Sequence, residues 1–201
     1  THGVAVDGAG HLYVIHEGQK EKKDHPAIFV FGPDGTFIRA FGSQFQGGGH
    51  GIEVRKEGSE EFLYVCGYQQ VKSFAKLTLD GEIVWFRKAP MESGAYAPGE
   101  DLSTTRNWSR QGFLPIHRYD KDAKWIGAFG GAGEGKGTFN TPHGLWIDRR
   151  PGREPTVVVT DRAHNTLQIF SLDGTYRETI PGFGLPANVD SWKNLLVVPE
   201  L

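Results

Sequence analysis

Three histidines of this sequence share one local pattern, in which a His-Gly pair stands directly before a short apolar run. The pairs begin at His2, His50 and His143, and the runs that follow them read VAVD, IEVR and LWID. Imidazole nitrogen is a preferred ligand of zinc and similar divalent ions. If the three positions converge in space, we expect them to hold a divalent metal, zinc foremost, with one coordination position left for water or substrate. The alternative is that each histidine only bonds neighbouring backbone or channel water.

Other side chains suited to chemistry lie in the loops expected near these histidines. Glu17 and Tyr68 are candidate general bases, because either group could accept a proton within hydrogen-bond reach. For Tyr68, aromatic packing at the rim of the site is the alternative. Segment 89–111 is rich in Pro, Gly, Ser and Thr and reads as a long loop that could fold over the site. The candidate substrate-binding residues in these loops are His16, Arg106, Trp108 and Arg162.

The elements that must position these residues are repeated units of four short strands. Residues 2–42, 50–88 and 143–181 each read as two apolar runs, a loop, and two further runs joined by an Asp-Gly pair. Asp-Gly favours a tight hairpin because it tolerates positive φ angles. Four antiparallel strands in about 45 residues are typical of a β-propeller blade. The first strand of a blade lies nearest the axis, so blade-start residues converge there. The glycine after each histidine lets the backbone pass closely, because it has no Cβ.

The spacing of the units predicts how the chain is organised. His2 and His50 are 48 residues apart, whereas His50 and His143 are 93 apart, which is close to two blades. We therefore expect one all-β propeller domain over 1–201, six-bladed when complete, with part of one blade and both ends missing from this sequence. The alternative is that 89–111 replaces the missing strands. The predicted units are 2–49, 50–88, 112–141 (incomplete), 142–184 and 185–201 (incomplete), with 89–111 as a loop.

Charge and composition exclude several classes of partner. The net charge is −2 and no strongly basic stretch occurs, so we expect no nucleic-acid partner. No apolar run reaches the roughly 18 residues needed to span a bilayer. Cys66, the one cysteine, cannot form an internal disulfide. The segment GGAGEGKGT at 130–138 lacks the Ser or Thr of a phosphate-binding loop and reads as an inter-blade connection. The expected partner is a small-molecule or peptide substrate, bound by a monomer.

Two stretches resemble the NHL-repeat family of β-propellers. They are FNTPHGLWID at 139–148 and VVVTDRAHNTLQIFSLDG at 157–174. The second is similar to the family's succession of a strand, an Asp-Arg pair, an asparagine, a second strand and an Asp-Gly pair. This resemblance implies that Asp161 and Asn165 stabilise a turn rather than carry out chemistry. It also implies a six-bladed propeller.

A narrower resemblance is to the peptidyl-α-hydroxyglycine α-amidating lyases, NHL-type propellers in which three blade-start histidines hold zinc. It rests on GVAVDGAGHLYVIHEG at 3–18, GHGIEV at 49–54, TPHGLWID at 141–148 and LPANVD at 185–190. Glu17 stands where that family has its catalytic arginine. Ala187 or Asn188 stands where it has its third histidine, which leaves Asn188 as a candidate substrate-binding residue. The family's catalytic tyrosine would fall in the segment expected to be missing after Pro115.

Together these patterns predict a metal-dependent propeller enzyme that acts on a small polar substrate at the central channel. The resemblance implies a lyase, with a hydrolase as another option, and a secreted or periplasmic protein. The full pattern also resembles uncharacterised bacterial NHL proteins. The alternative function is a non-catalytic NHL-repeat binding or scaffold propeller. A gluconolactonase-type calcium propeller fits less well, because the blade starts carry few carboxylates and calcium prefers oxygen ligands. A structural calcium ion is a second cofactor to consider.

Overall fold

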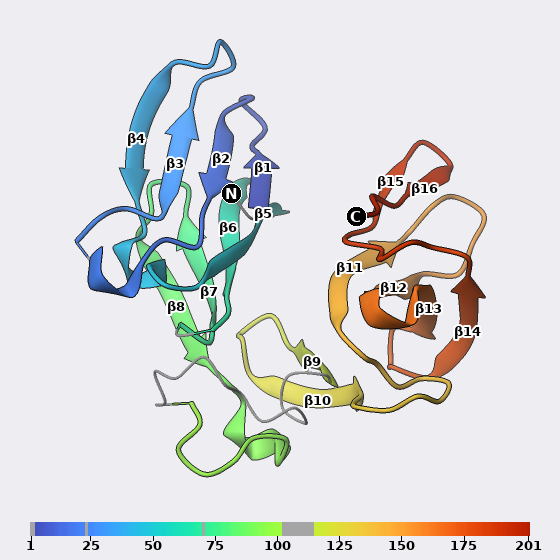
Figure 1. Ribbon diagram of the computed structural model, residues 1–201. Coiled ribbons are helices and arrows are strands. Elements are labelled where there is room, and N and C mark those ends of the chain that lie inside the picture. The colour runs from blue at the N-terminus through green and yellow to red at the C-terminus, as the bar shows by residue number, and fades with distance from the viewer. Residues whose placement is uncertain (1–2, 23, 70, 102–114) are drawn as a thin grey trace. The chain divides into compact units, whose positions relative to one another are not determined.

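The computed structural model describes residues 3–22, 24–69, 71–101 and 115–201 (Figure 1). Within these ranges the chain is almost entirely β-strand, as runs of β-branched and aromatic residues favour. Between the strands lie four short 3₁₀ turns: η1 (Lys20–Lys22), η2 (Ser43–Phe45), η3 (Met91–Ser93) and η4 (Arg162–His164). None of the helices in the described ranges is long and apolar enough to cross a membrane.

The described strands form three four-stranded antiparallel sheets and two hairpins. The first sheet contains β1 (Gly3–Val6), β2 (Leu12–Ile15), β3 (Ile28–Phe31) and β4 (Phe37–Phe41). The second contains β5 (Gly49–Glu57), β6 (Glu60–Gly67), β7 (Ser73–Thr78) and β8 (Ile83–Lys88). The third contains β11 (Pro142–Asp148), β12 (Thr156–Asp161), β13 (Thr166–Ser171) and β14 (Tyr176–Pro181). The hairpins are β9 (Pro115–Tyr119) with β10 (Trp125–Gly130), and β15 (Asp190–Trp192) with β16 (Leu195–Val197).

In each four-stranded sheet the strands pair in sequence order, so every connection is a hairpin. This order confirms the prediction of an all-β chain built from repeated four-strand units. The two isolated hairpins fall inside the ranges 112–141 and 185–201 that the sequence marks as incomplete units. The division of one domain into blades with these boundaries stays a prediction.

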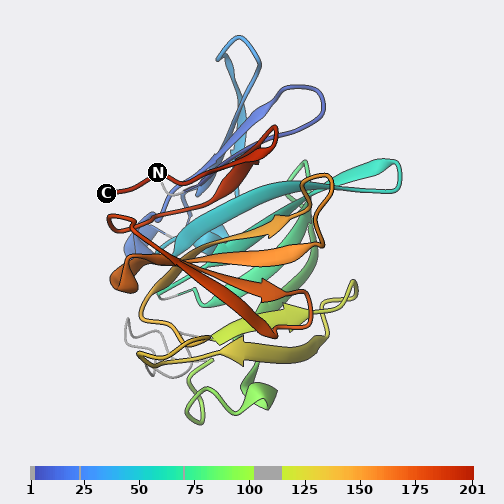
Figure 2. The same cartoon turned by 90° about the vertical axis from the view of Figure 1, so that its right-hand side faces the viewer.

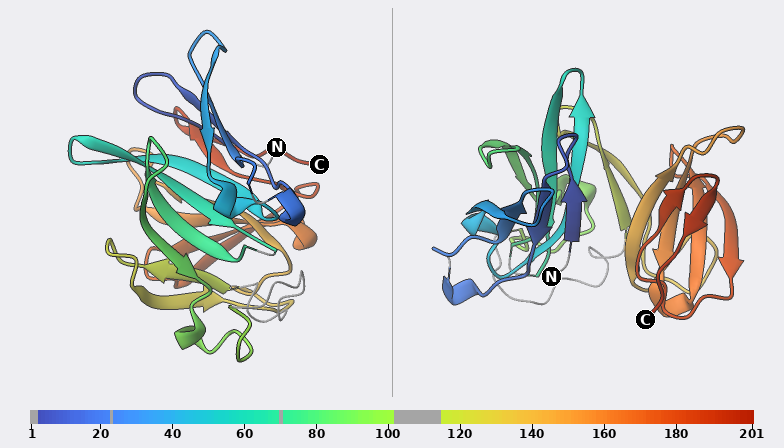
Figure 3. Two further views of the ribbon diagram at one scale, coloured as in Figure 1. Left: turned by 90° about the vertical axis from the view of Figure 1, so that its left-hand side faces the viewer. Right: turned by 90° about the horizontal axis from the view of Figure 1, so that it is seen from above.

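The contacts within the chain divide the protein into two compact units, residues 1–108 and 109–201. The first unit contains the sheets β1–β4 and β5–β8 (Figure 3). Buried residues of both sheets form one apolar core, in which Tyr13, Phe45 and Leu77 are fully buried. The second unit contains β11–β14 and both hairpins (Figure 2). Its two apolar clusters centre on Phe139 with Phe170 and on Val158 with Val189.

The Asp-Gly pairs close hairpins as predicted, but the turn differs from a two-residue loop. Only the glycines take positive φ, with values of 83° at Gly35, 95° at Gly81 and 91° at Gly174. In the first hairpin Gly35 N–H donates to Gly32 O at 2.9 Å, and Gly32 N–H donates to Thr36 O at 2.8 Å. These are three-residue loops that end in a left-handed glycine. A left-handed glycine widens the loop by one residue, and a register shift follows in the ladder of each of the three hairpins.

Candidate functional site

Two of the blade-start histidines occupy the same special backbone position, the extra residue of a β-bulge. Between β5 and β6, Gly49 pairs with Gly67 and Gly51 pairs with Cys66, which makes His50 the extra residue of a bulge. Between β11 and β12, the pairing shifts in the same way from Pro142 to Gly144 across His143. A bulge bends its strand and re-aims the extra side chain, and bulges are frequent beside active sites. His2 lies outside the described residues.

The glycines of two His-Gly pairs are required by the close approach of another backbone segment, at His50 on β5 and at Ala187 and Asn188 just before β15. A Cβ on Gly3 would lie 2.7 Å from the backbone oxygen of His50. A Cβ on Gly144 would lie 2.6 Å from the Cα atom of Asn188 and 3.1 Å from the backbone oxygen of Ala187. In each of the two compact units, the start of one repeat therefore contacts the start of the next repeat through backbone atoms. This contact is the close approach that the sequence predicts for these glycines.

The His143 ring has a fixed hydrogen-bond partner that determines where its lone pair lies. Nδ1 is 2.5 Å from the backbone oxygen of Ala187, which can only accept. Nδ1 must therefore carry the proton, and in the neutral ring the lone pair is on Nε2. Metal-bound histidines usually donate their second ring N–H to a carbonyl or carboxylate in this manner. The side chain is exposed, so the donor chemistry at His143 fits a metal ligand.

In the first unit, His50 is half-buried and lies against Tyr68. The two ring centroids are 4.6 Å apart, with the rings 68° from parallel. The Tyr68 backbone is tied to the strand that leads to His50, because its N–H donates to Gly48 O at 2.8 Å. Edge-to-face contact explains part of the role of Tyr68, as the packing alternative proposed. It also puts a phenol beside the blade-start imidazole, where a general base is predicted.

The loop that carries His16 and Glu17 contacts the segment just before His50 through backbone atoms. The carbonyl oxygen of Glu17 accepts hydrogen bonds from the N–H groups of Gly47 at 2.8 Å and Gly48 at 3.0 Å. A Cβ on Gly49 would lie 2.4 Å from the backbone oxygen of His16, so this glycine allows the loop to touch the strand. His16, Glu17, His50 and Tyr68 are thus brought to one end of the first unit's sheets.

The His16 side chain turns to a shallow hollow with a volume of about 360 Å³. Its Nε2 atom is 3.2 Å from the backbone oxygen of Pro26, and its ring centroid is 5.6 Å from that of Phe29. Gln46 also lines the hollow, and its amide accepts Gln19 N–H and donates to Pro26 O. The His16 ring is therefore held by the protein's own backbone at this hollow.

In the second unit, Arg162 and Asn188 flank the His143 bulge. The Arg162 N–H donates to Thr141 O at 3.0 Å, which fixes the start of η4 beside the residues that lead into the bulge. Asn188 packs directly over Gly144, and its Oδ1 atom accepts the N–H of Val189 at 2.9 Å. Both candidate substrate-binding residues therefore lie next to a blade-start histidine.

Three further candidates fall on residues that the structure does not describe. Arg106 and Trp108, like His2, lie outside the described residues. Across the described ranges, no three side chains of His, Cys, Asp or Glu gather closely enough to hold a metal ion. The three-histidine metal centre, which includes His2, stays a prediction.

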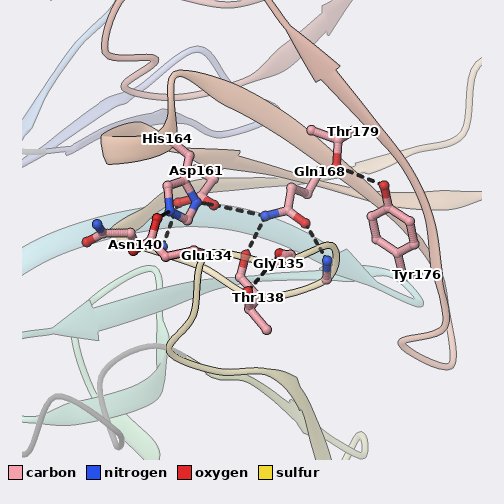
Figure 4. A network of polar contacts seen from close by, with 10 residues as sticks. Glu134, Gly135, Thr138, Asn140, Asp161, His164, Gln168, Tyr176 and Thr179 are labelled. Carbon is pink, nitrogen blue, oxygen red and sulfur yellow. Dashed lines mark hydrogen bonds and ion pairs between the residues drawn. The ribbon is translucent and has the colours of Figure 1, made fainter.

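The second unit contains a polar network that the sequence analysis did not predict as a whole (Figure 4). It joins Asp161 and His164 to Glu134, which lies in the glycine-rich connection, and to Gln168 on β13. Asp161 and Asn165 stabilise a turn as the resemblance implied: Asp161 accepts Asn140 N–H at 2.9 Å, and Asn165 is left-handed with φ 57°. Glu134 was missed because its partner is 30 residues away and no repeat motif includes it.

Several solved structures share the fold of this chain over almost its whole length. Virginiamycin B lyase from Staphylococcus aureus aligns with a TM-score of 0.63 and 13% identity, covering 99% of this chain and 62% of the lyase. A catalytically inactive histidine-to-alanine variant of that lyase with quinupristin aligns with a TM-score of 0.64 and 13% identity, with the same coverage. A streptogramin B lyase aligns with a TM-score of 0.65 and 16% identity, covering 99% of this chain and 61% of the lyase.

These neighbours are β-propellers, so the chain has the β-propeller fold that its repeats predict. The chain spans about 62% of the length of the first lyase. No protein-family model matches the sequence, and no curated protein matches it either. The NHL repeats, the number of blades and the similarity to amidating lyases therefore stay predictions from the sequence.

Proposed function

We propose that this protein is a β-propeller lyase whose blade-start histidines act on a small polar or peptide substrate. The observation that carries the proposal is the equivalence of His50 and His143. Each is the extra residue of a bulge at the start of a first strand. A bulge re-aims its extra side chain, and bulges are frequent beside active sites. The fold neighbours support the choice of a lyase, and one of them is a histidine-to-alanine variant that is catalytically inactive.

The proposed site uses His2, His50 and His143 as ligands of a divalent metal, with zinc as the first choice. The Nδ1–H bond of His143 to Ala187 O supports this role, because it leaves Nε2 as the donor atom. When bound, such an ion polarises a carbonyl or lowers the pKa of a coordinated hydroxyl group. The protein's own task is to hold the three rings in register and to supply a base.

Tyr68 and Glu17 are the proposed bases. In an elimination from an α-hydroxyglycine, the base takes the hydroxyl proton and a C=O bond forms. The C–N bond breaks as the C=O bond forms, and its electron pair leaves with the amide nitrogen, which regains a proton. Tyr68 is favoured over Glu17 because its ring already contacts His50. His16, Arg106, Trp108, Arg162 and Asn188 are proposed to bind the substrate.

Turnover assays with single-histidine variants test this proposal. Purified protein supplied with zinc is incubated with quinupristin and, separately, with a peptidyl-α-hydroxyglycine, and substrate loss is followed by mass spectrometry. We expect His50→Ala and His143→Ala each to lower kcat/KM for the accepted substrate by about a hundredfold or more. The matched control is His117→Gln, which changes a histidine on β9 outside the bulges and should leave kcat/KM within about twofold.

Two results would overturn the proposal. The histidines have no catalytic role if both alanine variants turn over substrate as fast as the wild type. The lyase assignment fails if the wild-type protein binds zinc but converts neither substrate. In that case the non-catalytic binding propeller becomes the better account.

A further inference from the structure

His164 is held between two carboxylates that come from different parts of the second unit (Figure 4). Its Nδ1 atom is 2.6 Å from Asp161 Oδ2, at the end of β12. Its Nε2 atom is 2.9 Å from Glu134 Oε2, in the connection between β10 and β11. The Asp161 side chain is fully buried, whereas 80% of the Glu134 side chain is exposed. One imidazole therefore bridges a rigid strand end and a surface loop.

Both contacts can be hydrogen bonds only when the ring is doubly protonated. A neutral imidazole has a single N–H, and an ionised carboxylate only accepts. With one ring proton, one of the two contacts would set a nitrogen lone pair against a carboxylate oxygen. The buried Asp161 keeps its bond, because Asn140 N–H and Gln168 Nε2 also fix that carboxylate, at 2.9 Å each. The contact to the exposed Glu134 is the one that must fail when the proton leaves.

Residues 131–138, called here the latch loop, are held on either side of Glu134 by bonds that do not titrate: Gly133 N–H donates to Phe139 O at 3.2 Å, and Thr138 Oγ1 donates to Gly135 O at 2.7 Å. Four of the eight residues are glycine, at positions 131, 133, 135 and 137, so the free loop has a large conformational entropy. Its C-terminal root is anchored by Gln168, whose amide accepts Gly137 N–H at 2.9 Å and donates to Thr138 O at 2.5 Å. Gln168 does not titrate, so this root anchor is independent of pH. The charged anchor at the tip is Glu134.

We propose that His164 is a proton-operated latch that fastens the tip of the latch loop while the imidazole is charged and frees it when the imidazole becomes neutral. The loop lies directly before Phe139 and the residues that enter the His143 bulge, and η4 bonds that entry through Ala163 N–H to Asn140 O at 3.1 Å. The latch therefore regulates the loop next to a blade start. The inference does not depend on any catalytic activity.

The direction of the pH effect follows from the groups that face the ring. Burial by itself lowers the pKa of His164, but the hydrogen bonds and charges of Asp161 and Glu134 outweigh it, so the pKa of His164 is raised above its ordinary value. Arg162 is the other charged residue on η4 itself. A raised pKa means that the latch is fully stabilising below about pH 6.5 and is lost as pH rises through the higher pKa of the folded state.

Nuclear magnetic resonance of the full chain tests the latch at the level of single residues. The pKa of His164 is read from its ring carbon shifts, and amide exchange of the latch loop is measured from pH 6 to pH 9 and corrected for the intrinsic exchange rate. In the wild type we expect exchange at Gly133 to Lys136 to become about two- to fivefold faster across the His164 titration, while Phe139 stays unchanged. Glu134→Gln should exchange at the faster rate throughout this range and should lower the pKa of His164.

Lys136→Gln is the matched control, because it removes a charge from the same loop without touching His164. It should keep the wild-type dependence on pH. The proposal is overturned if His164 of the wild type titrates at or below about 6.5. It is equally overturned if the amide exchange rates of the wild type and of Glu134→Gln differ by the same factor at every pH. The same holds if exchange at Phe139 changes with pH as much as exchange at Gly133 to Lys136.

Discussion

At the scale of the residue, the three His-Gly pairs share a sequence but not a steric requirement. Gly3 faces the backbone of His50, and Gly144 faces the backbone of Ala187 and Asn188, at distances that leave no room for a Cβ. Gly51 faces only the Cβ of Cys66, where an added methyl would be 3.6 Å away, an ordinary contact. Glycine is thus required sterically at Gly3 and Gly144, whereas Gly51 has room for a larger residue.

Alanine substitution at these glycines is the first prediction. We expect Gly3→Ala and Gly144→Ala each to lower the free energy of unfolding by about 1–3 kcal/mol, because a backbone atom must move to admit the methyl group. Gly51→Ala is the matched control and should change it by no more than about 0.5 kcal/mol. Urea unfolding followed by tryptophan fluorescence measures all three. A loss at Gly51→Ala as large as at Gly144→Ala would contradict this account.

The sequence predicted these positions only in part. The register of the repeats was enough to single out the histidines and to expect close backbone contact at the following glycine. It could not indicate the bulges at His50 and His143, because a bulge depends on how the partner strand is aligned. It could not indicate the bond from His143 to Ala187 either, since the two residues are 44 positions apart and one contributes only its backbone.

At the scale of the element, successive sheets interlock through their hairpin turns. The left-handed Gly81 of the β7–β8 turn packs on the ring of Phe41 at the end of β4, and Gly174 of the β13–β14 turn packs on Phe129 of β10. Arg39 Nη2 also donates to Leu79 O at 2.9 Å, and Arg118 donates in the same way to Asp173 O. The two units therefore repeat one mode of contact between neighbouring hairpins.

This contact predicts different costs for the same substitution in two similar turns. Gly35 has φ 83° but no atom within 4 Å of an added Cβ, so Gly35→Ala should cost only the left-handed backbone penalty of about 1–2 kcal/mol. In Gly81→Ala the new Cβ would lie 2.5 Å from the Phe41 ring, which adds about 1–3 kcal/mol. Thermal and urea unfolding of the two variants give the comparison. Equal losses would show that the turn does not pack on Phe41.

Most of the strand pattern was predictable at this scale, because alternating apolar runs and Asp-Gly turns are local signals. The hairpin of β9 and β10 closes with a turn that has no Asp-Gly pair to predict it. Its turn has the same two bonds, from Asp120 N–H to Lys124 O at 2.9 Å and from Ala123 N–H to Asp120 O at 3.0 Å. Ala123 takes the left-handed position with φ 58°, although it is not glycine. The packing of Phe41 and Phe129 was also hidden, since it joins segments far apart in the chain.

At the scale of the whole molecule, the repeats predict the β-propeller fold that the solved lyase structures share. Repetition identifies such a fold because each unit can bury its apolar faces only against its neighbours. Function is less accessible, because one fold carries many activities. The latch of Glu134 and His164 illustrates this limit: its two residues belong to different repeats and have no shared motif.

The central claim is that the blade-start histidines form a metal site, and its most direct test is the metal content of the intact protein. The purified protein is loaded with zinc, dialysed, and analysed by elemental emission beside His117→Gln and a variant combining His2→Ala, His50→Ala and His143→Ala. We predict about one equivalent of zinc in the wild type and in His117→Gln, and none in the triple variant. A wild-type protein without stoichiometric metal, or a triple variant that retains it, would contradict the claim.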